Sequence, residues 1–143
     1  MDKGVYRIID ANLNRAREGI RVCEDIIRFS SEDERLTRRL KKLRHDIFGA
    51  IEDLQKKHLE ELLASRSIDD VGRESIESET IRKNLVDLFL ANTQRAKESL
   101  RVLEEVSKLF GQNLSKKFKR FRFRIYDIEK AAVKDLEKIM KKR

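Results

Sequence analysis

Apolar residues recur along the chain at the three- and four-residue spacing that places them on one face of an α-helix. The clearest run starts at Leu36 and continues through Leu40, Leu43, Ile47 and Ile51. The residues between these positions are mostly charged, so the opposite faces of this helix are expected to meet water. The pattern predicts a bundle helix that extends to about residue 63.

The same spacing predicts three further helices, over about residues 5–30, 79–110 and 114–142. Ser31, with Glu34 three residues later, has the sequence of a capping box at the start of the second helix. Gly111 is suited to end the third helix because glycine accepts the backbone conformation that often follows a helix. Asn113 or Ser115 is expected near the start of the fourth helix.

The second half of the chain repeats the first. Residues 11–24 match residues 91–104 at eight of fourteen positions. The helices that follow also correspond, because residues 36–51 align with residues 114–129 and keep several apolar and basic positions. Each unit is therefore a pair of helices, and the chain is a duplicated helical hairpin.

This duplication predicts the fold class. We expect one all-α domain over residues 1–143, with hairpins at 5–63 and 79–142 joined by a polar loop at 64–78. Two hairpins of this length close most simply as an antiparallel four-helix bundle with pseudo-twofold symmetry.

Composition agrees with long helices, since the chain has no proline and 42% charged residues. Residues 115–143 hold twelve Lys and Arg against four acids, which accounts for the net charge of +8. This basic end suits either an anionic partner or a solvated helix face. No segment has the length and apolarity of a membrane span and the start is unlike a signal peptide, so a cytoplasmic protein without membrane contact is expected. Cys23 lies on an apolar stripe and is interpreted as a buried, inert thiol.

Polar side chains fall on the predicted buried faces of all four helices. On a helical wheel of the first helix, Asn12 lies at the centre of the apolar face, while Arg15 and Glu18 lie on its border. The duplication repeats this arrangement in the third helix, and the second and fourth helices also carry charge beside apolar residues. The inward polar residues predicted for these three helices are Asn92, Arg95, Glu98, Arg44, Arg122 and Glu129.

Burying a guanidinium or an amide costs several kcal/mol unless the group is paired. One interpretation is a structural network in which the glutamates neutralise the arginines. The other is a ligand site, because four arginines face only three glutamates and a surplus of forked donors suits phosphate oxygens. On the second interpretation, the four arginines bind phosphates, the two asparagines orient a heterocyclic substrate, and the three glutamates are catalytic or hold a metal.

The polar segment between the hairpins offers a possible metal site. Asp69 and Asp70, just before Gly72, can supply carboxylates to Mg²⁺. The same residues serve equally well in a turn or a helix cap. Neither glycine-rich phosphate-binding motif occurs, so any nucleotide must be held by side chains and helix ends. His45 and His58 are interpreted as surface or hydrogen-bonded histidines rather than bases.

These motifs resemble a known family. The segment DANLNRAREG at residues 10–19, followed by Arg21-Val22 and Glu24-Asp25, is similar to the signature of a helical domain often fused ahead of thiamine-phosphate synthase. The resemblance covers nearly the whole chain, and its opening motif is long and specific. The later matching segments are Leu43-Arg44-His45, Asp70-Val71-Gly72, Ala91-Asn92 with Arg95, residues 100–105, and Arg122 to Tyr126 with Glu129.

The resemblance implies a monofunctional kinase of thiamine biosynthesis, which converts hydroxymethylpyrimidine phosphate to the diphosphate with ATP and Mg²⁺. Its ligands would be a phosphorylated pyrimidine and a nucleotide, and an interior lined by arginines suits both. Because no synthase barrel follows Arg143, a stand-alone version is expected. The segment 66–70 is shorter and less acidic than expected for this family.

Two other functions stay open. A non-catalytic accessory domain could bind or regulate thiamine-phosphate synthase, with the interior charges acting only as ion pairs. Nucleic-acid binding through residues 116–143 ranks last, because Phe118 and Phe121 belong to the predicted core. The outward repetition of Arg21 with Glu24, and of their counterparts in the third helix, suggests a homodimer joined by reciprocal ion pairs.

Overall fold

The predicted antiparallel four-helix bundle is confirmed. The computed structural model describes residues 2–52, 54, 56, 60, 61, 63, 72 and 81–142. Within that part of the chain there are four α-helices and no strand. The helices are α1 (Lys3–Ile26), α2 (Glu34–Ala50), α5 (Leu85–Val106) and α6 (Gln112–Lys141). None of the helices found in the described residues is both long and apolar enough to cross a membrane.

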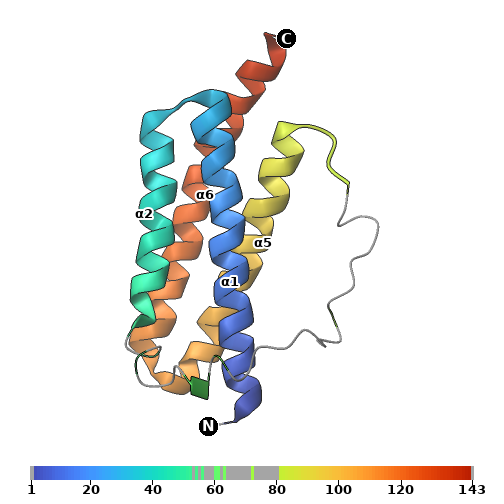
Figure 1. The fold of residues 1–143 in the computed structure, drawn as a ribbon. Helices are drawn as coiled ribbons and strands as arrows, with labels where there is room; N and C mark the ends of the chain where they lie inside the picture. Colours follow the sequence, from blue (N-terminus) through green and yellow to red (C-terminus); the bar gives the residue numbers. More distant parts are fainter. Residues whose placement is uncertain are drawn as a thin grey trace.

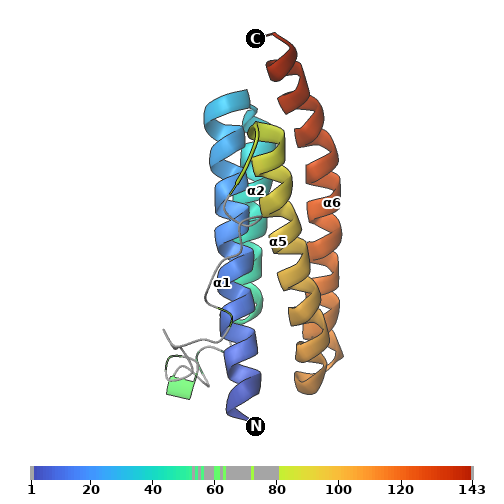
Figure 2. The same ribbon diagram turned by 90° about the vertical axis from the view of Figure 1, so that its right-hand side faces the viewer.

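The helices form two hairpins that pack against each other (Figure 1). A π-helical turn, Ile27–Ser31, leads from α1 toward α2, and a 3₁₀ turn, Ser107–Phe110, leads from α5 toward α6. The most extensive contact is between α1 and α5, and α2 lies against α6 on the other side. Figure 2 shows the hairpins as two layers, with the C-terminal end of α6 extending beyond the other helices.

The start of α2 differs from the prediction. Asp33 caps the helix, because its Oδ1 accepts a 2.9 Å hydrogen bond from the backbone N–H of Leu36. Ser31 instead donates to the carbonyl oxygen of Ile27 at 3.0 Å and remains part of the preceding turn. The capping box predicted for Ser31 and Glu34 was therefore wrong by two residues, since aspartate two positions later is an equally strong cap.

The second hairpin also differs at its helix ends. Helix α5 begins at Leu85 rather than near residue 79, because Asn84 caps it by accepting from Asp87 at 2.8 Å. Gly111 does follow the second hairpin's turn, with φ of 124°, a value that favours glycine. Helix α6 then starts directly at Gln112, so neither of the predicted caps begins it.

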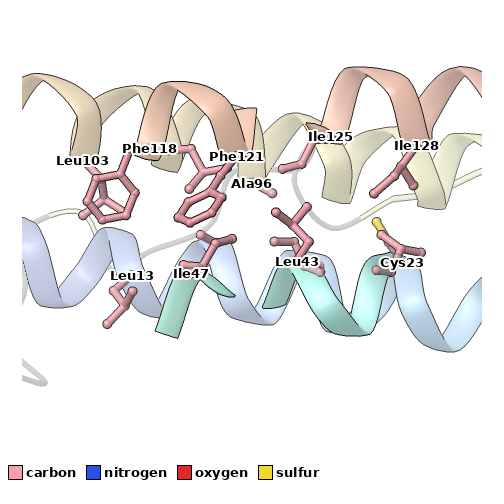
Figure 3. Packing of buried hydrophobic residues seen from close by; sticks show 14 of the residues in the cluster. Leu13, Cys23, Leu43, Ile47, Ala96, Leu103, Phe118, Phe121, Ile125 and Ile128 are labelled. Atoms are coloured by element: carbon pink, nitrogen blue, oxygen red, sulfur yellow. The ribbon is translucent and has the colours of Figure 1, made fainter. Parts of the chain in front are cut away.

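The core lies between the two hairpins. Figure 3 shows Phe118 and Phe121 of α6 pointing into the space between the helices, with Phe121 above Ile47 of α2. Their rings pack edge to face with centroids 6.1 Å apart. The predicted apolar faces of α2 and α6 are buried as expected, and so is Cys23. Burial raises the pKa of the Cys23 thiol far above its usual range, so it stays protonated, in agreement with an inert role.

Helices α1 and α5 approach each other closely at a glycine. A Cβ atom added to Gly19 would lie 2.8 Å from the backbone oxygen of Asn92 and 3.7 Å from the Cβ of Ala96. Ala16 and Ala96 occupy equivalent positions in the duplication and are fully buried. Small side chains at this seam let the two hairpins join over a long, narrow contact.

Candidate functional site

Two buried glutamates bind two of the four arginines that we expected in the interior, Arg44 and Arg122. Glu24 is only 3% exposed, and its Oε1 accepts from Nε of Arg44 at 3.1 Å. Arg21 lies on the solvent side of the same carboxylate, at 3.6 Å. In the second hairpin, Oε2 of Glu104 accepts from Nη2 of Arg122 at 3.2 Å. Its Oε1 forms an ion pair with Nη1 of Arg101, also at 3.2 Å. Each hairpin thus contains the same Arg–Glu–Arg triad.

These triads correct two predictions. The arginines of α2 and α6 do turn inward, but each has a carboxylate partner, as the structural interpretation required. The partners are Glu24 and Glu104, which we had expected to face outward and form ion pairs with a second subunit. Since these carboxylates are used within the chain, the argument from them for a homodimer no longer holds.

The other two predicted phosphate-binding residues are not in the interior. Arg15 and Arg95 are exposed, and so are Glu18 and Glu98. They lie far enough round α1 and α5 from the core that their long side chains reach water. The prediction of an inward position was therefore wrong for all four, whereas their possible role in a surface site is unaffected.

The predicted substrate-orienting residues lie at the seam between α1 and α5. The side-chain amide of Asn12 donates to the carbonyl oxygen of Ile8 at 2.9 Å, and that of Asn92 donates to Leu88 at 2.8 Å. Because helical residues three apart share a side, Arg15 and Arg95 are placed on the outer side of the same seam. Both asparagines therefore bond to their own helices, while Arg15 and Arg95 are exposed.

A surface groove of about 360 Å³ lies between α5 and α6. It brings together two of the predicted site residues and four that were not predicted. The lining residues are Gln94, Lys97, Glu98, Arg101, Arg122 and Tyr126. Three of the six are cations and one is a carboxylate, and each cation also pairs with a glutamate beside the groove, Lys97 with Glu129 and both arginines with Glu104. At the edge of the groove, the side-chain amide of Gln94 donates a 3.0 Å hydrogen bond to Oε1 of Glu98.

Glu129, predicted as catalytic, lies beside this groove and binds two other residues. Nζ of Lys97 lies 3.0 Å from Oε2 of Glu129 and 3.1 Å from Oε1. The hydroxyl of Thr93 donates a short hydrogen bond to the same Oε2. The lysine also lies over the ring of Tyr126, 4.7 Å from its centroid. The Lys97 side chain is only 12% exposed and contacts both Glu129 and the ring of Tyr126.

The first hairpin has a different composition at the matching positions. In the repeat, Leu13 corresponds to Thr93 and Ile51 to Glu129. Both are fully buried core residues. Arg17 takes the place of Lys97 and lies 4.8 Å from the ring centroid of Phe48. The cation and the aromatic ring are therefore present in both hairpins, but the carboxylate and the hydroxyl are present only in the second.

This difference was visible in the sequence. A polar residue opposite an apolar one in an otherwise matched repeat marks a position where the two halves have different tasks. Thr93, which was not predicted, could have been found in this way by comparing the repeats for mismatches as well as identities. Arg101, in contrast, had been assigned to the outward face, and nothing in its spacing indicated a groove.

A second groove, of about 390 Å³, lies between α2 and α6. It is lined by His45, Asp46, Gly49, Ala50, Lys117, Arg120 and Phe121. At its side, Nη1 of Arg124 donates to Oδ2 of Asp46 at 2.8 Å. Burial opposes ionisation of Asp46, but the hydrogen bond and the charge of Arg124 outweigh it and lower the pKa of the carboxyl group. None of the predicted site residues lines this groove.

The predicted metal ligands, Asp69 and Asp70, lie outside the described residues, as does His58. Within the described ranges, no group of three or more His, Cys, Asp or Glu could hold a metal ion by itself. Mg²⁺ commonly uses one or two carboxylates together with substrate phosphates. Glu98, exposed at the rim of the α5–α6 groove, fits that requirement.

Several known proteins are similar to this chain. A thiamine-phosphate synthase of Nostoc punctiforme is 41% identical over 127 residues, which cover 87% of this chain and 34% of that protein. A thiamine-phosphate synthase of Thermosynechococcus vestitus is 43% identical, with the same coverage of both chains. One of Prochlorococcus marinus is 40% identical over 130 residues, or 90% of this chain and 35% of the relative. No solved structure is significantly similar.

The chain therefore spans about a third of the length of the curated relatives it matches. The sequence profile of the ThiD2 family matches residues 7–131. This range includes the duplicated motif, both Arg–Glu–Arg triads and the α5–α6 groove. The chain belongs to the ThiD2 family.

Proposed function

We propose that this chain is a kinase of thiamine biosynthesis that converts hydroxymethylpyrimidine phosphate to the diphosphate with ATP. The observation that carries the proposal is the α5–α6 groove, which is lined by three cations and an exposed aromatic ring. The similarity to thiamine-phosphate synthases supports the pathway, and the resemblance described above supports the reaction.

The groove suits a small phosphorylated heterocycle. Its volume of about 360 Å³ is within the range of small-molecule sites. Tyr126 is 43% exposed, and a pyrimidine can stack on the part of its ring that Lys97 does not cover. Arg101 and Arg122 are both oriented by Glu104, so their remaining N–H donors are held in place for phosphate oxygens.

The nucleotide would bind beside the groove, along the exposed side of α5. Arg95 follows Gln94 in the chain, and helical geometry turns it about 100° toward the α1–α5 seam. Arg15 lies on the same seam, so two arginines related by the pseudo-twofold axis are available for nucleotide phosphates. Glu98 lies between the seam and the groove, where it could hold Mg²⁺ brought with the nucleotide.

The chemistry asks little of the protein beyond positioning. The attacking atom is a phosphate oxygen that is already ionised at neutral pH, so a strong general base is unnecessary. The arginines hold both phosphate groups and neutralise their charge, which is the main requirement of phosphoryl transfer. Bound Mg²⁺ would neutralise the charge that develops between the two phosphates.

The test is incubation of the full chain with hydroxymethylpyrimidine phosphate, ATP and Mg²⁺, with the diphosphate detected by coupling to a thiamine-phosphate synthase. Arg101→Gln should lower kcat/KM about 10- to 100-fold because it removes a charged phosphate contact. Arg21→Gln is the matched control, since it occupies the same place in the first triad, and its kcat/KM should change less than about 3-fold.

Arg15→Ala tests the nucleotide part of the proposal. Its side chain is exposed, so the helical circular dichroism signal should be retained while turnover is lost. Absence of ATP-dependent diphosphate from the unmodified chain would refute the kinase. Equal effects of Arg101→Gln and Arg21→Gln would refute the groove as the site.

One observation favours a second function. The inward arginines, Arg44 and Arg122, are matched by carboxylates, as expected for a structural network in an accessory domain. Such a domain would bind or regulate a thiamine-phosphate synthase without consuming ATP. Binding to the synthase in the absence of any ATP turnover would support this alternative.

A further inference from the structure

Both hairpins have an Arg–Glu–Arg triad and a cation over an aromatic ring. They differ at two matching positions, which are 93 and 129 in the second hairpin and 13 and 51 in the first. In the second hairpin, Lys97 is paired with Glu129, and Thr93 donates to the same carboxylate. In the first, the residues at the matching sequence positions are Leu13 and Ile51, and both are buried. A bundle of this kind therefore folds without the polar cluster, so the cluster's presence in one half needs another explanation.

The polar cluster has a cost for stability. A carboxylate and an ammonium group that are largely withdrawn from water lose hydration, and their attraction often only balances that loss. Apolar residues of similar size, as found in the first hairpin, are usually at least as stabilising at such positions. The arrangement is thus better explained by a task that requires a lysine at the groove.

We infer that Lys97 is a phosphate-binding residue of the α5–α6 groove and that Thr93 and Glu129 position it. This inference rests on the proposed function and adds to it the residue that responds to the phosphorylated pyrimidine. Lys97 lines the groove, and its ammonium group has three N–H donors. Two of these meet the oxygens of Glu129, and the group can turn toward a phosphate placed in the groove.

The role of Thr93 follows from the geometry. When Lys97 turns toward the phosphate, Glu129 would lose donors in a place that is only 19% exposed. An ionised carboxylate left short of hydrogen bonds in such a place is costly. The hydroxyl of Thr93 already donates to Oε2 of Glu129, so the carboxylate keeps a partner while the lysine moves. Thr93 therefore lowers the free-energy cost of moving the Lys97 ammonium group from Glu129 to the phosphate.

Lys97→Met provides the first test, with calorimetric binding of hydroxymethylpyrimidine phosphate and of the unphosphorylated pyrimidine as readouts. Loss of a charged phosphate contact should raise the Kd for the phosphate ester about 10- to 100-fold and leave that for the free pyrimidine within about 3-fold. Arg17→Met is the matched control, because it also removes a cation from an aromatic ring. Its Kd for the phosphate ester should stay within about 2-fold of the unmodified chain.

Thr93 variants test the positioning role. Thr93→Val keeps the shape but removes the hydroxyl, and it should raise the Kd for the phosphate ester about 3- to 10-fold. Thr93→Ser retains the hydroxyl and should bind like the unmodified chain. Adding Glu129→Gln to Thr93→Val should restore binding to within about 2-fold, because no carboxylate then retains Lys97. A purely structural role would give additive losses in the double variant.

The outcomes separate this inference from the proposed function. If the unmodified chain binds and phosphorylates the ester while Lys97→Met and Arg17→Met behave alike, the inference is wrong and the kinase stands. If the ester binds through Lys97 but is not phosphorylated, the binding role stands and the kinase is wrong. If the unmodified chain does not bind the ester, both are wrong.

Discussion

The first and second hairpins of this protein have the same Arg–Glu–Arg triad but differ in the residues near the cation that lies over an aromatic ring. Both contain a buried glutamate held between two arginines, and both place a cation over an aromatic ring. Behind that cation, the first hairpin has leucine and isoleucine, whereas the second has Thr93 and Glu129. The shared features are those that the bundle needs, and the feature found once is the better candidate for function.

The duplication thus provides an internal control. A polar group in the interior is usually ambiguous, because a structural ion pair and a ligand site have the same composition. Here the first hairpin shows which polar groups the fold uses twice. By this comparison, the triads support the fold in both hairpins, although Arg101 and Arg122 of the second also line the α5–α6 groove, and the cluster of Lys97, Thr93 and Glu129 is the feature found once.

The largest expected effect on stability comes from replacing the buried glutamate of either triad. Glu24→Gln and Glu104→Gln each leave two arginines without their buried carboxylate, and each should lower the free energy of unfolding by about 3 kcal/mol. Because the triads match, the two losses should agree within about 1 kcal/mol, as measured by urea denaturation. A loss confined to one of them would contradict the equivalence of the hairpins.

A smaller effect is expected where the hairpins meet. In Gly19→Ala, the new methyl group would lie 2.8 Å from the backbone oxygen of Asn92, so α1 and α5 must separate slightly. The free energy of unfolding should fall by about 1–3 kcal/mol. Gly49→Ala in α2 is the control, since a Cβ there meets no atom within 4 Å. That variant should gain about 0.5–1 kcal/mol from helix propensity, and thermal unfolding can compare the two.

The smallest effect concerns a feature present at one hairpin turn only. Asp33, the cap of α2, lies beside Asp135 of α6, whereas the matching position in the second hairpin is Gly111. A hydrogen bond between the carboxyl groups raises the pKa of Asp135 and lowers that of Asp33. The contribution of Asp135 to stability is therefore present at low pH and is lost as the pH rises through its raised pKa. That of Asp33 has the opposite sign and is lost at still lower pH.

Asp135→Asn should replace the shared proton by an amide donor that does not titrate. The variant should unfold about 1–3 °C higher than the unmodified chain near pH 7, because the repulsion between two charged carboxylates is gone. The difference should shrink as the pH falls below the raised pKa of Asp135, and melting curves across this range provide the measurement. A constant difference at every pH would show that the carboxyl pair does not titrate as described.

Much of the fold could be predicted from local patterns. The spacing of Leu36, Leu40, Leu43 and Ile47 identified the buried face of α2, and the repeat identified the second hairpin. Helix ends were less predictable, because Ser31 and Asp33 are both good caps and local sequence does not choose between them. The candidate site was predicted only in part, since Arg122, Glu98 and Glu129 meet at or beside the groove, whereas Arg15 and Arg95 lie outside it.

By itself, the sequence determined that this protein is a duplicated helical hairpin, since the periodicity and the internal repeat are properties of each segment alone. Only the tertiary structure decided which side chains meet. Arg44 reaches Glu24, and Lys97 lies between Glu129 and Tyr126, because of how far each helix is rotated and how closely its neighbour packs. A wheel drawn for one helix contains neither quantity, so it can indicate which residues face inward but not what they bind.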